Sequence, residues 1–373
     1  MDLFGVPERP DEPDEFAGSY VPDEVEDYLK HPREMTFCMG HEKFEAQILE
    51  AFAAGKMPHS IVLSGPKGCG KSTMAYRLGR FLLANGDFNP GQGGLFGDEP
   101  DFSSLDVARD HDAFRLIASE GHPDLFAVER QYDATKNKFK NAVDVEEIRK
   151  IAPFLRKTAS YGGWRVVIVD DADTMTRSAQ NAILKILEEP PSRVLIVLVT
   201  HNIGALIPTI RSRVQVFHLQ ALEDDVMREL LVKDGQGDIE KLVELSEGSM
   251  SKAMEYAESG ATEILQTILS QGGDVRWSEI HKIADQIGGR GQDEDFAIFA
   301  RLSLWIYEQG AKTKARGRDL PGVLGAARER FGQLSLEQIL KICDTLSEHF
   351  TKTKSANLDK RQAVLQAFSI MAG

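Results

Sequence analysis

The stretch Gly65-Pro66-Lys67-Gly68-Cys69-Gly70-Lys71-Ser72 follows a short apolar run at 61–64 and precedes a run with helical spacing. It fits the pattern G-x-x-x-x-G-K-[ST], whose glycines let backbone amides point toward a bound phosphate. The lysine reaches the β- and γ-phosphates and the hydroxyl ligates Mg²⁺, whereas a glycine-rich turn that binds nothing needs neither side chain. The stretch therefore predicts a strand, a phosphate-binding loop and a helix. The candidate nucleotide-binding residues in it are Gly65, Gly68, Gly70, Lys71, Ser72 and Thr73.

A second apolar run, residues 165–170, ends at the acidic pair Asp170 and Asp171. The usual partner of a phosphate-binding loop is a buried strand ending in an acid that holds Mg²⁺. Ser72 and Asp170 are therefore the candidate Mg²⁺ residues. Ring-forming ATPases place a glutamate directly after that acid as the base, and an aspartate there is shorter by about 1.5 Å. Asp171 is thus a candidate catalytic base in a weakened position, and a helix-capping or solvent-facing acid is the other interpretation.

Short apolar runs alternate with helical patterns up to about residue 220, which is typical of an α/β layer with a mainly parallel sheet. The runs are rich in Val, Ile and Leu and mostly lack polar alternate positions, so we expect strands buried on both faces. Five strands are predicted, at 61–64, 125–129, 165–170, 194–200 and 214–219. Helices are predicted between them, at 41–55, 71–84, 145–158 and 177–188.

Beyond residue 219 the strand signal ends and only helical patterns follow. Helices are predicted at 222–232, 238–247, 250–259, 278–288, 293–310, 321–331, 335–352 and 357–371. Asp144 with Glu147, and Ser335 with Gln338, have the spacing of a capping box at a helix start. We therefore expect an acidic tail at 1–30, an α/β domain at 31–220, a small helical domain at 221–275 and a helical C-terminal domain at 276–373.

Composition and charge limit the class of protein. The chain has 373 residues, enough for two or three domains. Residues 1–30 hold ten acids, two bases and four prolines, which is typical of a disordered tail and accounts for −8 of the net charge of −14. That charge argues against a protein that coats nucleic acid. No apolar run approaches the ~18 residues of a membrane span and no secretory signal is present, so we expect a cytoplasmic protein with no membrane partner.

Two further segments, read with the phosphate-binding loop, carry the pattern of a known family. Residues 178–191 read Ser-Ala-Gln-Asn-Ala-Ile-Leu-Lys-Ile-Leu-Glu-Glu-Pro-Pro, and residues 209–214 read Thr-Ile-Arg-Ser-Arg-Val. Together they resemble the clamp-loader branch of the AAA+ ATPases, and within it the delta-prime subunits of bacterial DNA polymerase III. His122-Pro123-Asp124-Leu125 and Asn357-Leu358-Asp359 are similar to that group as well. The resemblance runs from about residue 31 to the C-terminus.

The resemblance implies a fold and a function. The fold is an α/β AAA+ nucleotide-binding domain with a parallel five-stranded sheet, then an α-helical lid and an α-helical collar that holds a five-subunit ring together. The implied cofactors are ATP and Mg²⁺, and the implied partners are other clamp-loader subunits in a hetero-pentameric ring. Through that complex the partners include a sliding clamp and primed DNA. The implied function is loading the clamp onto primed DNA in the bacterial cytoplasm during replication, with no polymerase activity of the chain itself.

The resemblance also assigns site residues. Arg213 matches an arginine finger that reaches the ATP of the neighbouring subunit, a role suited to a guanidinium that neutralises charge on the γ-phosphate. A surface arginine paired with an acid is the other interpretation. Thr200, at the end of the fourth strand, is a candidate γ-phosphate sensor or, equally, a capping threonine.

Three departures from the family pattern bear on activity. Val214 stands where the Ser-Arg-Cys motif has cysteine, which is a conservative change. Residues 85–125 contain no cysteine where many relatives carry a four-cysteine zinc module, so no zinc is expected. Ser251 follows Gly248-Ser249-Met250 where active loader ATPases have arginine. We therefore expect ATP binding with weak or no intrinsic hydrolysis. The alternative is an autonomous ATP-hydrolysing AAA+ motor, such as a loader ATPase or branch-migration helicase, which should have glutamate at 171 and arginine at 251.

Overall fold

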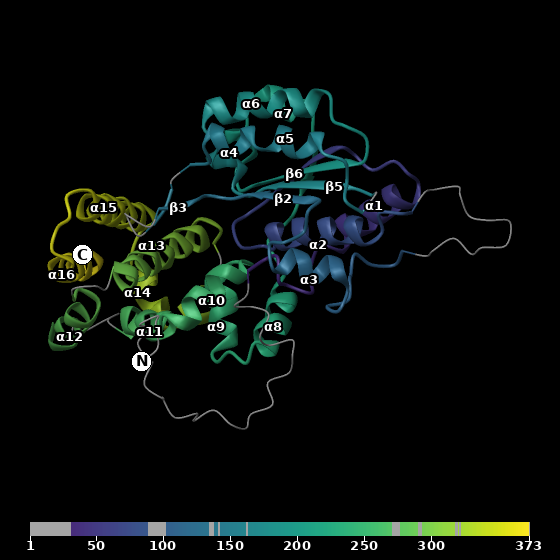
Figure 1. The fold of residues 1–373 in the computed structure, drawn as a ribbon. Helices are drawn as coiled ribbons and strands as arrows, with labels where there is room; N and C mark the ends of the chain where they lie inside the picture. The colour runs from purple at the N-terminus through teal and green to yellow at the C-terminus, as the bar shows by residue number, and fades with distance from the viewer. Residues whose placement is uncertain are drawn as a thin grey trace, which may run out of the picture.

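A five-stranded parallel sheet forms the centre of the first half of the chain, with strand order β2-β5-β6-β1-β7 (Figure 1). The computed structural model describes residues 31–88, 102–133, 138–140, 142–161, 163–270, 277–289, 293–317, 320 and 322–372. The tail expected at 1–30 lies outside the described residues. The five strands are those predicted: β1 Ser60–Ser64, β2 Leu125–Val128, β5 Arg165–Val169, β6 Val194–Thr200 and β7 Gln215–His218. The order places β5 between β2 and β6, which brings the ends of three strands together beside the phosphate-binding loop.

Helices cover both faces of this sheet, as Figure 1 shows. On one face pack α1 Glu42–Ala53, α2 Lys71–Ala84 and α3 Asp112–Ala118, through an apolar cluster that includes Phe52 and Leu78. On the other face pack α4 Val145–Arg149, α5 Ile151–Arg156, α6 Arg177–Glu188 and α7 Pro208–Arg211. All seven residues of β6 are buried, as a strand covered on both sides requires. Short elements connect the layers: β3 Tyr132–Asp133, β4 Lys138–Phe139, η2 Ala172–Thr174 and η3 Ile203–Ala205.

Two sequence expectations in this half need correction, and two features were not expected. The helix predicted at 145–158 is two helices, α4 and α5, because Pro153 lacks the N–H that would continue the ladder from Arg149 and its ring crowds that carbonyl. Asp144 does stand at the start of α4, but its side chain makes no capping bond and instead accepts from Lys140 at 3.4 Å. Helix α3 and the β3–β4 hairpin were not predicted.

The second half of the chain is helical. The segment expected to be a lid contains α8 Asp224–Lys233, α9 Ile239–Ser246, α10 Met250–Glu258 and the unpredicted α11 Ala261–Ser270. The segment expected to be a collar contains α12 Trp277–Ile287, α13 Asp293–Ala315, η4 Gly322–Ala327, α14 Arg328–Gln333, α15 Leu336–Ser355 and α16 Lys360–Ala372. The capping box predicted for Ser335 and Gln338 is present at α15, with both reciprocal hydrogen bonds.

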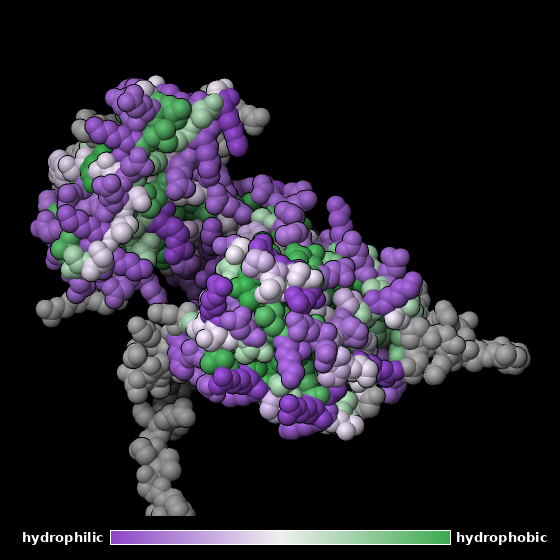
Figure 2. Space-filling model, turned by 90° about the horizontal axis from the view of Figure 1, so that it is seen from above, coloured by the Kyte–Doolittle hydropathy of each residue, from purple (hydrophilic) through white to green (hydrophobic). Residues whose placement is uncertain are grey.

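One continuous apolar core joins these two helical segments. It runs from Leu222 through Leu265 and Phe299 to Met371. Arg301 of α13 adds a two-pronged contact to Glu255 of α10, with N···O distances of 2.8 and 2.9 Å. The boundary at residue 275 therefore separates helices that share a core, and experiments on the collar are best done with the full chain. Seen from above, the surface is largely hydrophilic, with apolar side chains reaching it in small groups (Figure 2).

Candidate functional site

The phosphate-binding loop joins the end of β1 to the start of α2. Gly68 and Gly70 have φ values of +78° and +96°, a left-handed backbone that side chains disfavour. A Cβ on Gly68 would also lie 2.1 Å from Ser251 Oγ, and one on Gly65 would lie 2.1 Å from the Leu219 carbonyl oxygen. Glycine is thus required at all three positions, for backbone conformation, for space or for both.

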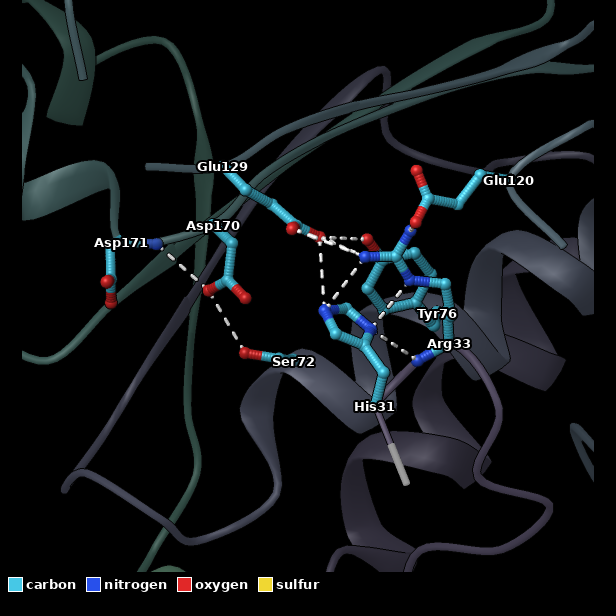
Figure 3. A network of polar contacts seen from close by, with 8 residues as sticks. All are labelled: His31, Arg33, Ser72, Tyr76, Glu120, Glu129, Asp170 and Asp171. Atoms are coloured by element: carbon cyan, nitrogen blue, oxygen red, sulfur yellow. Dashed lines mark hydrogen bonds and ion pairs between the residues drawn. The ribbon is translucent and has the colours of Figure 1, made fainter. Parts of the chain in front are cut away.

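Lys71, Ser72 and Asp170 meet at this loop. The Ser72 hydroxyl donates to Asp170 Oδ1 at 3.0 Å, and Figure 3 shows the two side chains pointing toward each other. Burial raises the pKa of Asp170, while the Ser72 hydrogen bond opposes that rise. Lys71 is buried and donates to the Pro66 carbonyl, and burial lowers the pKa of its ammonium. An anion in the loop would therefore compensate a desolvated cation, and the hydroxyl and carboxylate are the hard oxygen ligands that Mg²⁺ prefers.

A cleft of about 1050 Å³ opens beside the phosphate-binding loop. Its lining includes the loop, with Thr73, and Asp170, and also the apolar residues Met35, Phe37, Met39, Met250 and Met254. Four acidic side chains line it as well, those of Glu255, Glu258, Glu294 and Asp295. Phosphate-binding groups and apolar side chains in one cleft suit a ligand that carries phosphates and a flat base. The residues present thus fit a nucleoside triphosphate with Mg²⁺.

Asp171 lies beside the site but its carboxylate is already engaged. The residue has a left-handed backbone, with φ +53°, and its side chain points away from Asp170 (Figure 3). One carboxylate oxygen lies 2.7 Å from Arg130 Nε and the other 3.0 Å from His201 Nε2. The hydrogen bond with His201 lowers the pKa of Asp171, against the effect of burial and together with the charge of Arg130. A carboxylate engaged by the Arg130 ion pair and the His201 hydrogen bond is poorly placed to accept a proton from water.

Sequence reasoning missed Arg130 and His201. Arg130 comes just after β2 and His201 just after β6, the two neighbours of β5. Both residues follow predicted strands, and residues that follow neighbouring parallel strands meet at one edge of a sheet. The sequence does not give the strand order, so it could not show that these two strands flank β5.

Thr200 is fully buried at the end of β6. Its hydroxyl accepts from the Asn202 N–H at 3.1 Å, and its carbonyl accepts from the Gly65 N–H at 3.3 Å. The capping contact is therefore present, and Thr200 is not among the residues that line the cleft. The sensor role of Thr200 stays a prediction.

The helical segment after β7 lies directly on the phosphate-binding loop. The Met250 N–H donates to the Gly68 carbonyl at 2.9 Å, and Ser249 caps α10 by accepting from the Lys252 N–H. Ser251 packs so close to Gly68 that no side chain fits between them. The short side chain at position 251 is thus part of this contact, and an arginine there would have to be accommodated differently.

A half-buried polar cluster lies next to the site and anchors the segment that precedes α1 (Figure 3). Glu129, just after β2, accepts from the Tyr76 hydroxyl at 2.7 Å and lies 3.4 Å from Arg33 and 3.6 Å from His31. Burial alone would raise the pKa of Glu129. The nearby imidazole of His31, the hydrogen bond from Tyr76 and the charge of Arg33 instead lower the pKa of Glu129 from 4.5 to about 2.

This lowered pKa makes a contribution to stability that depends on pH. Because the folded-state pKa is below the unfolded value, the contribution is present above pH 4.5 and is lost as pH falls toward about 2. Glu129→Gln should therefore lower the free energy of unfolding at pH 7, and the difference from wild type should shrink between pH 4.5 and 2.5. Urea unfolding across this range measures it. Glu120→Gln, which removes an exposed carboxylate on the same arginine, is the matched control. A pH-independent difference for Glu129→Gln would contradict the assignment.

Arg213 lies apart from this site, between α7 and β7. Its guanidinium lies 2.8 Å from Glu188 of α6 and donates to the Thr209 carbonyl at 2.9 Å and to Ser212 at 3.2 Å. The side chain is 36% exposed. The surface position and the pairing with an acid are both observed, and they leave the trans role open.

In the described part of the chain, no group of three or more His, Cys, Asp and Glu side chains is arranged to hold a metal ion. Within the same residues, no helix combines the length and the apolar character that crossing a bilayer demands.

Known proteins similar in sequence to this chain include a family that matches it over the residues that form the sheet and the phosphate-binding loop. The family described as "DNA polymerase III, delta subunit" matches residues 40–223. The delta' subunit of Pseudomonas aeruginosa DNA polymerase III is 33% identical over 155 residues, 42% of this chain and 41% of that one. The Escherichia coli delta' subunit is 29% identical over 173 residues, 46% of each chain. A gamma/tau subunit of Mycobacterium bovis is 31% identical over 207 residues, 55% of this chain and 32% of that one.

These matches cover less than half the length of each of those relatives. Among solved structures, a DNA polymerase III gamma-subunit-related protein of Thermotoga maritima is similar with a TM-score of 0.39 and 19% identity, covering 87% of this chain and 98% of that one. The family match, the phosphate-binding loop and the sheet order coincide in the first half of the chain. Residues 40–223 therefore resemble the clamp-loader subunits of bacterial DNA polymerase III, with delta' subunits among the relatives that they match.

Proposed function

We propose that this chain is a delta-prime-like subunit of a DNA polymerase III clamp loader. It binds ATP with Mg²⁺, hydrolyses it weakly or not at all, and supplies Arg213 to the ATP of an adjacent subunit. In a hetero-pentameric ring with other clamp-loader subunits, it helps open a sliding clamp and place it on primed DNA in the bacterial cytoplasm. The names of the similar proteins support the complex, and the described residues support the division of labour within it.

Nucleotide binding is supported by the phosphate-binding loop and the acid beside it. Lys71 is a buried cation near the Asp170 carboxylate, and Ser72 is already hydrogen-bonded to that carboxylate. Bound ATP would place its phosphates on the loop amides and on Lys71, and Mg²⁺ would be held through Ser72 and Asp170. The apolar side chains of the cleft lining would contact the base.

Weak hydrolysis is supported by two residues. Asp171 is short and is held by Arg130 and His201, so positioning an attacking water would first require breaking an ion pair. Ser251 lines the cleft but offers no charge to a γ-phosphate, where an arginine would. Both features favour a chain that binds nucleotide without turning it over rapidly.

The observation that carries the trans role is the place of Arg213 on the sheet. Strands β1 and β7 are parallel, with Ile61 opposite Gln215 and Ser64 opposite His218. Arg213 precedes β7, whereas the phosphate-binding loop follows β1. The two therefore lie at opposite ends of adjacent strands, about 20 Å apart at 3.3 Å per residue. An arginine side chain cannot span that distance, so a phosphate that Arg213 contacts must belong to another chain.

Reconstitution tests the proposal. The chain, co-expressed with the gamma/tau-type and delta-type subunits of the same bacterium, should co-purify with them as one complex on size exclusion. Phosphate release by the isolated chain should be a small fraction of that by the complex with primed DNA and clamp. Failure to join the complex would refute the assignment, and turnover by the isolated chain equal to that of the complex would favour an autonomous motor.

A further inference from the structure

The guanidinium of Arg213 contacts three acceptors: Glu188 in α6, Thr209 in α7 and Ser212 in the turn after α7. Nη1 donates to the Thr209 carbonyl at 2.9 Å and to the Ser212 hydroxyl at 3.2 Å. Nη2 lies 2.8 Å from Glu188 Oε1, at the C-terminus of α6. The carboxylate is the one charged member of this set.

The backbone of Arg213 is fixed as well. Its N–H donates to the Ile210 carbonyl at 2.9 Å, and its carbonyl accepts from the Ser60 hydroxyl at 3.0 Å. Ser60 is buried at the start of β1, so the sheet itself sets where the side chain leaves the backbone. Both ends of a flexible side chain are therefore restrained.

One edge of the guanidinium remains open. The group carries five N–H donors, and the contacts above use both protons of Nη1 and one of Nη2. Within the described part of the chain, no hydrogen bond or ion pair engages Nε. Nε and the second Nη2 proton form the side-by-side edge that binds two oxygens of a phosphate. Since Arg213 is at the surface, this edge is available to a phosphate from outside the chain.

We propose that Glu188 is a positioning residue for Arg213: it holds the guanidinium so that its Nε and Nη2 edge faces a nucleotide phosphate of the adjacent subunit. This inference rests on the proposed function of Arg213. An unrestrained arginine side chain would lose conformational entropy when it contacts the phosphate. An arginine that Glu188 already restrains has lost that entropy beforehand, so its contact with the phosphate in the transition state costs less free energy. Glu188 does not touch the nucleotide in this arrangement.

The neighbouring Glu189 supplies a matched control. It carries the same charge one residue further along and is exposed, and within the described residues its carboxylate makes no hydrogen bond or ion pair. If only negative charge near Arg213 mattered, Glu188→Gln and Glu189→Gln would lower ATP turnover equally. If the direct contact between Glu188 and Arg213 matters, only Glu188→Gln would lower it.

The test uses the reconstituted complex with primed DNA and clamp, and measures kcat and KM for ATP. Glu188→Gln is expected to lower kcat roughly five-fold with KM unchanged, an effect on the scale of a partly exposed ion pair acting in the transition state. Glu189→Gln should leave both unchanged. In an Arg213→Ala background, Glu188→Gln should have no further effect, because the group that it positions is gone. Size exclusion and thermal unfolding should match wild type.

Several outcomes would overturn the inference. Equal effects of the two glutamine variants, a rise in kcat for Glu188→Gln, or the same fold loss in the Arg213→Ala background would each show that Glu188 does not act through Arg213. If Glu188→Gln is neutral while Arg213→Ala is damaging, the inference fails and the proposed function stands. If Arg213→Ala is itself neutral, the trans role fails and the inference falls with it.

Discussion

Lys71→Ala is expected to weaken ATP binding by this chain severely. Among the described residues, the buried Lys71 ammonium has one hydrogen-bond acceptor, the Pro66 carbonyl, and the carboxylate whose charge affects it most is that of Asp170. Charge-assisted contacts to phosphate contribute about 3 kcal/mol, so binding should weaken on the order of 100-fold. Equilibrium dialysis with ATP and Mg²⁺ measures this directly.

Lys67→Ala is the control for Lys71→Ala. Lys67 lies in the same loop but is exposed, so its removal should change affinity little. Because burial already lowers the pKa of Lys71, removing that amine should not reduce the thermal stability of the protein. A wild-type chain that binds no ATP at millimolar concentration would show that the loop has no ligand of this kind.

Arg213→Ala should cause the largest loss of activity in the complex. The arginine is fixed at its backbone and guanidinium and presents one edge outward, at the end of the sheet opposite its own phosphate-binding loop. Removing an arginine finger lowers kcat at the dependent site by roughly 10³–10⁵-fold, although other sites in the ring will mask part of this in a bulk assay. Single-turnover phosphate release from the complex resolves the slow site.

The same variant should leave the chain otherwise intact. Its ATP affinity should equal that of wild type, because Arg213 is about 20 Å along the strands from its own loop. Co-purification with the partner subunits should also persist. Loss of assembly would show instead that Arg213 is an interface residue whose ATPase effect is indirect.

The strands were predictable because burial on both faces leaves an unbroken apolar run. Val194–Thr200 was predicted and found with the same bounds. The break between α4 and α5 was readable at Pro153 and was missed. Helix α3 has seven residues, too few for a helical pattern to stand out. Gly260, with φ +63°, separates α10 from α11, so the second helix did not appear as a continuation of the first.

The site residues that lie in one continuous segment could be predicted from the sequence. The contacts between residues from different segments could not, because they depend on the fold. The loop of residues 65–72 and the end of β5 follow from local pattern alone. The pairing of Asp171 with Arg130 and His201 depends on β5 lying between β2 and β6, which the sequence does not state. The same holds for Glu188 and Arg213: the pattern marks both residues, but only the packing of α6 beside the start of β7 makes them partners.

The most direct test of the division of labour compares Arg213→Ala with Asp171→Asn in otherwise identical complexes. Steady-state phosphate release with primed DNA and clamp is measured for each. Arg213→Ala should strongly reduce the rate, and Asp171→Asn should change it little, because that carboxylate is short and already held by Arg130 and His201. If Asp171→Asn proves the more damaging of the two, the chain is itself a working ATPase and the proposed role is wrong.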